Sequence, residues 1–146
     1  MRVVRVSVLL AALTVALAVP LAVLAGGSST RQALPTFAFG RTGGNIIPFT
    51  VTIARNGHVS TTGTQKLTLT FATPALRNGL AKLAKAEGFW TEATFLSCGK
   101  INPDVAGHFI TVTAGGKTRT VTERGTCYAS FEELYAVLSA ATGAGP

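Results

Sequence analysis

The chain has few of the side chains on which most enzymes rely for catalysis. Its 146 residues include two histidines, two cysteines and six acidic residues. It contains no G-x-S-x-G nucleophile turn, no H-E-x-x-H helix and no phosphate-binding loop. Two histidines far apart in the sequence, with two cysteines that are expected to pair, also argue against a zinc site. We therefore predict a non-enzymatic protein without a metal or another cofactor.

Clusters of basic residues are also absent, although the formal net charge is +7 at pH 7. Two of the 13 lysines and arginines lie in the first five residues, and the others are scattered along the chain. Scattered basic side chains are typical of a solvated surface, whereas a polyanion site needs them gathered. The sequence therefore predicts no nucleic-acid partner.

The first 25 residues have the layout of an export signal. Arg2 and Arg5 precede an apolar run over residues 6–24, which ends in small side chains. This order predicts a signal peptide over residues 1–25, cleaved after Ala25. The same run is about long enough to cross a bilayer, so a retained membrane anchor is the alternative. Cleavage would leave a secreted or extracytoplasmic protein of the cell envelope, away from the membrane and monomeric.

The two cysteines, Cys98 and Cys127, are expected to form a disulfide in an oxidising compartment. Closing that loop would stabilise the fold by about 3–4 kcal/mol in the chain-entropy description. A reactive thiol would need a neighbouring base, and no C-x-x-C or Cys-His spacing supplies one. We therefore assign the pair a structural role.

The chain after the signal begins with a tether and continues into a strand-rich region. Residues 26–35 are polar and contain glycine and serine, which is typical of a flexible tether. Residues 36–40, with alternating Phe37 and Phe39, predict a short edge strand. A further strand is expected over residues 67–71, with apolar side chains on one face.

Between these strands the sequence predicts a hairpin with a defined register. Apolar residues alternate over residues 49–53, and Asn56-Gly57 is a turn signal. A three-residue loop with Gly57 in the left-handed conformation sets Ile53 opposite Val59 and so brings apolar side chains together. The same register sets Val51 opposite Thr61.

The second half predicts two helices and another hairpin. Thr73-Pro74 supplies an N-cap and a first helical residue, and Gly88 is suited to end that helix. Residues 91–107 show no clear period and are expected to form a loop. A hairpin turns at Gly115-Gly116, and residues 130–133 have the capping-box pattern that begins a last helix.

Strands and helices that follow one another in groups predict an α+β fold. We expect a single domain over residues 36–142, followed by a tail of residues 143–146. Its small antiparallel sheet would consist of the meander and the second hairpin, with two helices packed on one face and one disulfide.

His108 carries the catalytic alternative. With a two-residue turn in the second hairpin, His108 lies opposite Glu123. Such a pair could act as a general base with its orienting carboxylate, and Asp104 is a second candidate for the carboxylate. A small secreted hydrolase is therefore an alternative to a binding role, although an ordinary cross-strand contact explains the same pair.

The start of the first hairpin resembles the opening of an uncharacterised α+β domain family of exported bacterial proteins. That family's pattern is Pro-x-aromatic-x-Val-x-Ile, a turn glycine, then valine and glycine. The matching residues here are Pro48-Phe49-Thr50-Val51-Thr52-Ile53, Gly57, Val59 and Gly63. The later helix, Phe89-Trp90 and the second hairpin follow in compatible order, so the resemblance spans about residues 48–138. Cysteines near the start of the family's pattern are absent here, because residues 44–47 contain none.

A second pattern consists of Gly43-Gly44, of Ala86-Glu87-Gly88-Phe89-Trp90, and of Phe109-Ile110-Thr111-Val112 with Gly115-Gly116. This pattern resembles emfourin-like inhibitors of thermolysin-type metallopeptidases. The resemblance implies an inhibitor without assigning its contact residues. Ile46-Ile47-Pro48 and the cysteine pair depart from that family's pattern.

We therefore expect an exported domain that binds a protein or cell-envelope partner. Peptidase inhibition is the most specific form of this hypothesis. A structural component of the cell envelope is the remaining alternative. Loops on a rigid sheet commonly carry recognition, and glycines let the backbone approach a partner closely. The candidate contact loop contains Arg41, Gly43, Gly44, Asn45, Ile46 and Ile47. A plain connection into the next strand is the simpler explanation of the same segment.

Overall fold

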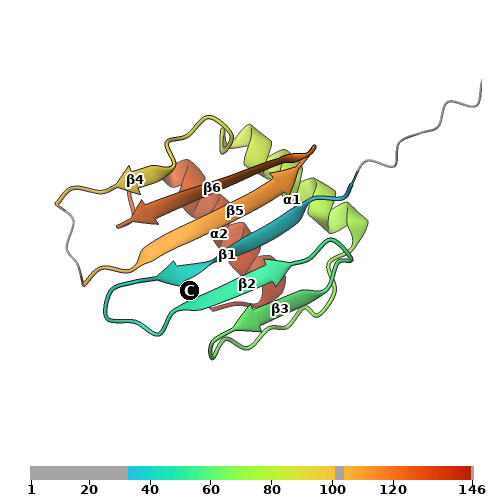
Figure 1. Cartoon of the computed structure of the whole chain (residues 1–146), viewed down its shortest axis with the longest axis horizontal. Coiled ribbons are helices and arrows are strands. Elements are labelled where there is room, and N and C mark those ends of the chain that lie inside the picture. The colour runs from blue at the N-terminus through green and yellow to red at the C-terminus, as the bar shows by residue number, and fades with distance from the viewer. Residues whose placement is uncertain (1–32, 101–103, 146) are drawn as a thin grey trace, which may run out of the picture. The chain divides into compact units, whose positions relative to one another are not determined.

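The computed structural model describes residues 33–100 and 104–145. In this part of the chain, six strands form one mixed sheet in the order β3-β2-β1-β5-β6-β4, and two helices cover one of its faces (Figure 1). The elements are β1 (Thr36–Thr42), β2 (Phe49–Ile53), β3 (Val59–Thr62), α1 (Pro74–Ala86), β4 (Phe95–Ser97), β5 (Gly107–Ala114), β6 (Lys117–Arg124) and α2 (Ala129–Thr142). This architecture confirms the α+β fold. The predicted signal peptide and most of the tether lie outside the described residues.

The core lies between the sheet and the two helices. Every second residue of the central strands points toward the helices and is buried, as the period of two requires. The fully buried side chains from the strands include Phe37, Phe39, Val51, Ile53, Ile110 and Val112, and those from α2 include Leu134 and Leu138. Neither helix of the described chain is long and apolar enough to span a membrane.

The prediction that β1 is an edge strand was wrong. β1 pairs antiparallel with β2 on one side and with β5 on the other. Phe37 and Phe39 are 1% and 0% exposed, because strands on both sides and helices on one face cover them. The alternation of Phe37 and Phe39 indicated one buried face, but it did not show that both edges of the strand are paired.

The register predicted for the first hairpin is confirmed. Ile53 lies opposite Val59 and Val51 lies opposite Thr61. Gly57 has a φ of 90° and packs so closely on Phe71 and Ala72 that a Cβ would approach them within 2.8 Å. A left-handed conformation in a crowded position requires glycine here.

The third meander strand, expected over residues 67–71, does not form. The structure records only a single bridge there, between His58 and Phe71. The backbone amides of Thr68 and Leu69 instead donate to the carbonyl of Thr142, at the end of α2. Residues 67–71 are thus held at Thr68 and Leu69 by the end of α2. The side chain of Phe71 is 53% exposed.

Helix α1 begins and ends as predicted. The side-chain oxygen of Thr73 accepts a hydrogen bond from the amide of Leu76 at 3.2 Å, and Pro74 occupies the first turn. Gly88 follows the helix with a φ of 72°. A feature that the sequence did not reveal is Arg77, which is 2% exposed and donates from Nη1 to the carbonyls of Ala54 and Arg55.

The predicted loop over residues 91–107 contains a strand, and this strand changes the sheet. β4 pairs parallel with β6, with Leu96 opposite Glu123, so the sheet is mixed rather than purely antiparallel. A three-residue strand has too few residues to show a period of two. The second hairpin is confirmed, with Ala114 opposite Lys117 across Gly115-Gly116.

The capping box predicted at residues 130–133 is not formed. Helix α2 begins at Ala129 after Tyr128, which makes no side-chain cap, and the hydroxyl of Ser130 donates to a carboxylate oxygen of Glu92. The expected tail is also partly built into the fold, because Ala144 is 5% exposed. Gly143, with a φ of 74°, turns the chain back after the helix.

Candidate functional site

The predicted disulfide is present and joins two elements that the sequence separates. Cys98, directly after β4, bonds to Cys127, two residues before the start of α2, with 5.7 Å between their Cα atoms. Cys127 is exposed and Cys98 is half-buried. The bridge therefore links the edge of the sheet formed by β4 to the start of α2, and Cys127 is the more exposed of its two residues.

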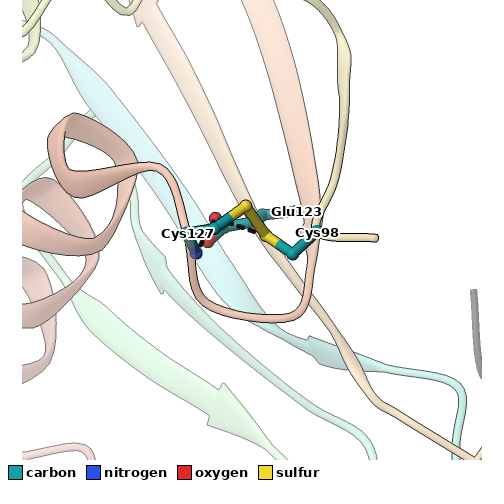
Figure 2. Close-up of side chains that lie close together, drawn as sticks. All are labelled: Cys98, Glu123 and Cys127. Atoms are coloured by element: carbon teal, nitrogen blue, oxygen red, sulfur yellow. Dashed lines mark hydrogen bonds between the residues drawn. A yellow bond between two sulfur atoms is a disulfide. The ribbon is translucent and has the colours of Figure 1, made fainter. Parts of the chain in front are cut away.

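A buried carboxyl group lies directly beneath the bridge. Glu123 is 0% exposed, and its Oε1 accepts hydrogen bonds from the amides of Cys127 at 3.1 Å and Tyr128 at 2.9 Å. The same oxygen lies 3.5 Å from Sγ of Cys98 (Figure 2). Glu123 thus caps the chain as it enters α2, a role that the sequence suggested for Ser130.

The strand pattern explains how a carboxyl group reaches this position. Along β6, Val121 and Glu123 are the buried residues, and Thr122 between them is only half-buried. An acidic residue in phase with a buried valine is the sequence signal for an inward-facing carboxyl. The hairpin register predicted that Glu123 lies opposite His108, and the phase with Val121 is the additional signal that Glu123 is buried.

The buried position changes the acidity of Glu123. Burial, and a hydrogen bond shared with the Glu132 carboxyl of α2, raise the pKa of Glu123 to about 7. The amides of Cys127 and Tyr128 act in the opposite direction, because they stabilise the ionised form. Burial is thus the larger cause of the raised pKa of Glu123, and the neighbouring Glu132 carboxyl adds to it.

His108 completes the cluster around this carboxyl pair. It lies opposite Glu123 on β5, as predicted, and its ring stacks on Tyr135 with centroids 4.7 Å apart. Nδ1 lies 3.7 Å from Oε1 of Glu132, while Nε2 accepts a hydrogen bond from Nε of Arg41 at 3.0 Å. Burial first, and then the charge of Arg41, lower the pKa of His108. The ring is therefore neutral, with its proton on Nδ1.

These contacts limit the chemistry open to His108. A general base needs a free nitrogen lone pair, and the lone pair on Nε2 is engaged by Arg41. His108, Glu123 and Glu132 place one nitrogen and two carboxylate oxygens within 4.8 Å of one another, which is a possible ligand set for a divalent cation. Coordination through Nδ1 would move the ring proton to Nε2, where it would face the N–H of Arg41. The protonation pattern thus favours a proton over a metal ion in this cluster.

The predicted contact loop divides between the sheet and the loop that follows it. Arg41 belongs to β1, opposite His108, whereas Gly43 and Gly44 are in the left-handed region. A Cβ on Gly44 would lie 2.7 Å from the backbone of Asp104 and Ala106. The loop after β1 is therefore packed against the segment before β5.

Hydrogen bonds hold these two segments together. The backbone amide of Asn45 donates to the carbonyl of Asp104, and its side-chain amide donates to the Asp104 carboxylate, both at 3.3 Å. Beside this junction, Ile47 is 69% exposed and Val105 is 40% exposed, while Ile46 is half-buried. We call residues 43–47 with residues 104–106 the paired-loop surface; it lies at the end of the sheet where β1 ends and β5 begins (Figure 1).

No family profile, curated protein or solved structure matches this chain. The two family resemblances of the sequence therefore stay predictions, and the function has to be inferred from the chain's own chemistry.

Proposed function

We propose that the protein is an exported binding domain that contacts a protein or cell-envelope partner through the paired-loop surface. The observation that carries the proposal is the exposure of Ile47, at 69%, on a loop that Asn45 ties to Asp104. An isoleucine that is left exposed on an anchored loop can fill a pocket on a partner.

Anchoring matters because a loop that must be ordered on binding loses affinity. Each side chain or loop segment immobilised at an interface costs free energy, which a preformed loop avoids. Gly44 fits against the backbone of residues 104–106, and two hydrogen bonds of Asn45 add to that contact. One loop directly follows β1 and the other directly precedes β5, and these two paired strands give both loops a rigid base.

Peptidase inhibition is the sharpest version of this proposal. Its support is the resemblance to emfourin-like inhibitors together with an exposed apolar residue on a held loop. A purely structural role in the cell envelope is the rival that the same surface allows. The hydrolase alternative has less support, because a catalytic His108 would first have to lose its hydrogen bond from Arg41.

A titration with matched variants tests the proposal. The full exported protein is titrated against thermolysin-type and serine peptidases, and against cell-envelope fractions in a sedimentation assay. We expect binding to at least one of them, and a loss of at least tenfold in affinity for Ile47→Glu and for Val105→Glu. Val137→Glu is the control, since Val137 is an exposed apolar residue, 37% accessible, on helix α2. Equal loss in all three variants, at unchanged melting temperature, would contradict a role for the paired-loop surface.

A further inference from the structure

We propose that the Cys98–Cys127 disulfide undergoes thiol–disulfide exchange with thiols of polypeptides outside the cell, with Cys127 as the attacked sulfur and Glu123 as the proton donor to Cys98. This activity goes beyond binding at the paired-loop surface and does not depend on it. It departs from the purely structural role that the sequence predicted for the two cysteines.

The first support is the unequal exposure of the two cysteine residues. Cys127 is exposed and lies directly before Tyr128, the N-cap residue of the 14-residue helix α2. Cys98 is half-buried, and its side chain packs on Gly125, where a Cβ would approach Cβ of Cys98 to 2.6 Å. An incoming thiolate therefore reaches Cys127 more easily, and the positive end of the helix dipole stabilises negative charge there.

The second support is the position of Glu123. Glu123 caps the entry to α2, but a neutral acceptor could fill that role, and burying a carboxyl group is costly. Glu123 is nonetheless 0% exposed, and its Oε1 lies 3.5 Å from Sγ of Cys98. A protonated Glu123 carries its proton on the other oxygen, because Oε1 accepts from two amides. The proton can pass to a departing Cys98 thiolate when the carboxyl group turns, with the loss of those two hydrogen bonds.

The surrounding groups keep a proton available at Glu123. Glu132 faces it from α2 and His108 faces it from β5, with Arg41 of β1 behind the histidine. The pKa of Glu123, raised to about 7 by burial and by Glu132, leaves the group substantially protonated in neutral surroundings. The cluster thus has a proton to give and, after donation, a carboxylate that can take one back.

The exchange balances as two displacements. A substrate thiolate attacks Sγ of Cys127, the bond between the two cysteines breaks, and Cys98 leaves with the electron pair and takes the proton of Glu123. A second thiolate of the substrate then attacks the substrate sulfur of the mixed disulfide. This step expels Cys127 as a thiolate, which takes a proton from solvent. Two substrate thiols are oxidised to a disulfide while the Cys98–Cys127 bond is reduced to two thiols, and a disulfide-bonded oxidant restores it by the reverse steps.

The rate of reduction of the intact protein by dithiothreitol tests the proton donor. We expect Glu123→Gln to slow reduction about tenfold at pH 6, because glutamine keeps an acceptor for the amides of Cys127 and Tyr128 but has no acidic proton. Glu133→Gln, an exposed position in α2, should leave the rate unchanged. The wild-type rate should also be independent of low urea concentrations. A brace that opens only on unfolding would show equal rates in wild type and Glu123→Gln, or a rate that rises with urea, and either result would overturn the proposal.

Trapping with oxidised glutathione tests which sulfur is attacked. In Cys98→Ser the remaining Cys127 thiol should form a mixed disulfide at least tenfold faster than the Cys98 thiol of Cys127→Ser, as measured by mass spectrometry. Equal or reversed rates would overturn the assignment of Cys127. Circular dichroism of both variants reports whether they are folded. If either variant is unfolded, the rates at which dithiothreitol reduces the wild type and Glu123→Gln decide the proposal.

Discussion

Arg41 and His108 lie opposite each other on β1 and β5, and Nε of Arg41 donates a hydrogen bond to Nε2 of His108 at 3.0 Å. The two residues are 67 positions apart in the sequence. This single contact fixes the tautomer of the imidazole and directs its N–H toward the carboxyl pair of Glu123 and Glu132. It also fills the position that a substrate would need if His108 were a general base.

Removing the guanidinium of Arg41 should make the imidazole of His108 easier to protonate. In Arg41→Met the pKa of His108 should rise toward its ordinary value of 6.5, because the second cause of its lowering is gone, while burial still holds it somewhat below that value. An NMR titration of the imidazole C–H resonances measures this shift. Arg55→Met, which alters an exposed arginine, is the control, and an unchanged His108 pKa in Arg41→Met would show that burial acts alone.

Glu123 should make the protein less stable as the pH rises. The folded state holds the Glu123 proton up to about pH 7, whereas the unfolded chain releases it near 4.5. The free energy of unfolding should therefore fall between these two pH values, by an amount on the order of 3 kcal/mol, and should not fall further above them. His108 acts in the opposite sense, because a lowered pKa removes stability as the pH falls through 6.5.

The comparison of Glu123→Gln with wild type isolates the loss of stability that the Glu123 carboxyl causes as the pH rises. Urea denaturation measures the free energy of unfolding at pH 5 and at pH 7.5. This free energy should change less between the two pH values in Glu123→Gln than in wild type, since glutamine does not titrate. Glu133→Gln should keep the wild-type difference. A variant that loses as much stability as wild type over this interval would rule out Glu123 as the titrating group.

Arg77 should contribute to stability although it is charged and buried. Its Nη1 donates to the carbonyls of Ala54 at 3.3 Å and Arg55 at 2.7 Å, which binds α1 to the end of β2. Arg77→Met keeps much of the apolar stem and leaves these carbonyls without that donor, so it should cost about 2 kcal/mol in urea denaturation. Lys82→Met, an exposed position in the same helix, should change stability by less than about 0.5 kcal/mol. Similar losses in both variants would show that the buried contacts of Arg77 are not the cause.

Export should leave a defined N-terminus. Mass spectrometry of the protein recovered from the culture medium or the cell envelope should find a chain that begins at or near Gly26, because small residues before that position suit a signal peptidase. Recovery of an intact Met1 from washed membranes would identify the segment as a retained anchor instead.

Local signals in the sequence predicted most of the elements correctly. The turn at Asn56-Gly57 and the alternation before it were enough to set Ile53 opposite Val59, because only one loop length brings apolar residues together. Thr73 and Gly88 likewise bound α1, since caps act over only a few residues. The α+β class followed from the grouping of these elements.

Local sequence patterns did not predict the features that depend on contacts between segments far apart in the chain. β4 is only three residues long and becomes a strand because β6 lies beside it. Residues 67–71 have an alternating pattern, but the end of α2 supplies the hydrogen-bond partner at Thr142. In the candidate site, the pairing of His108 with Glu123 followed from the hairpin, whereas Arg41 and Glu132 join them only through the tertiary fold.

The central position of β1 has a consequence for the order of folding. β1 is the first strand of the described chain, and a chain that is synthesised or exported from its N-terminus delivers it first. Its partner β2 follows after a short loop, but β5, which covers its other edge, begins only at Gly107. The sheet therefore cannot close until most of the chain has emerged, and Phe37 and Phe39 remain exposed for that interval. The two edges of β1 are therefore covered at different times, first by β2 and only later by β5.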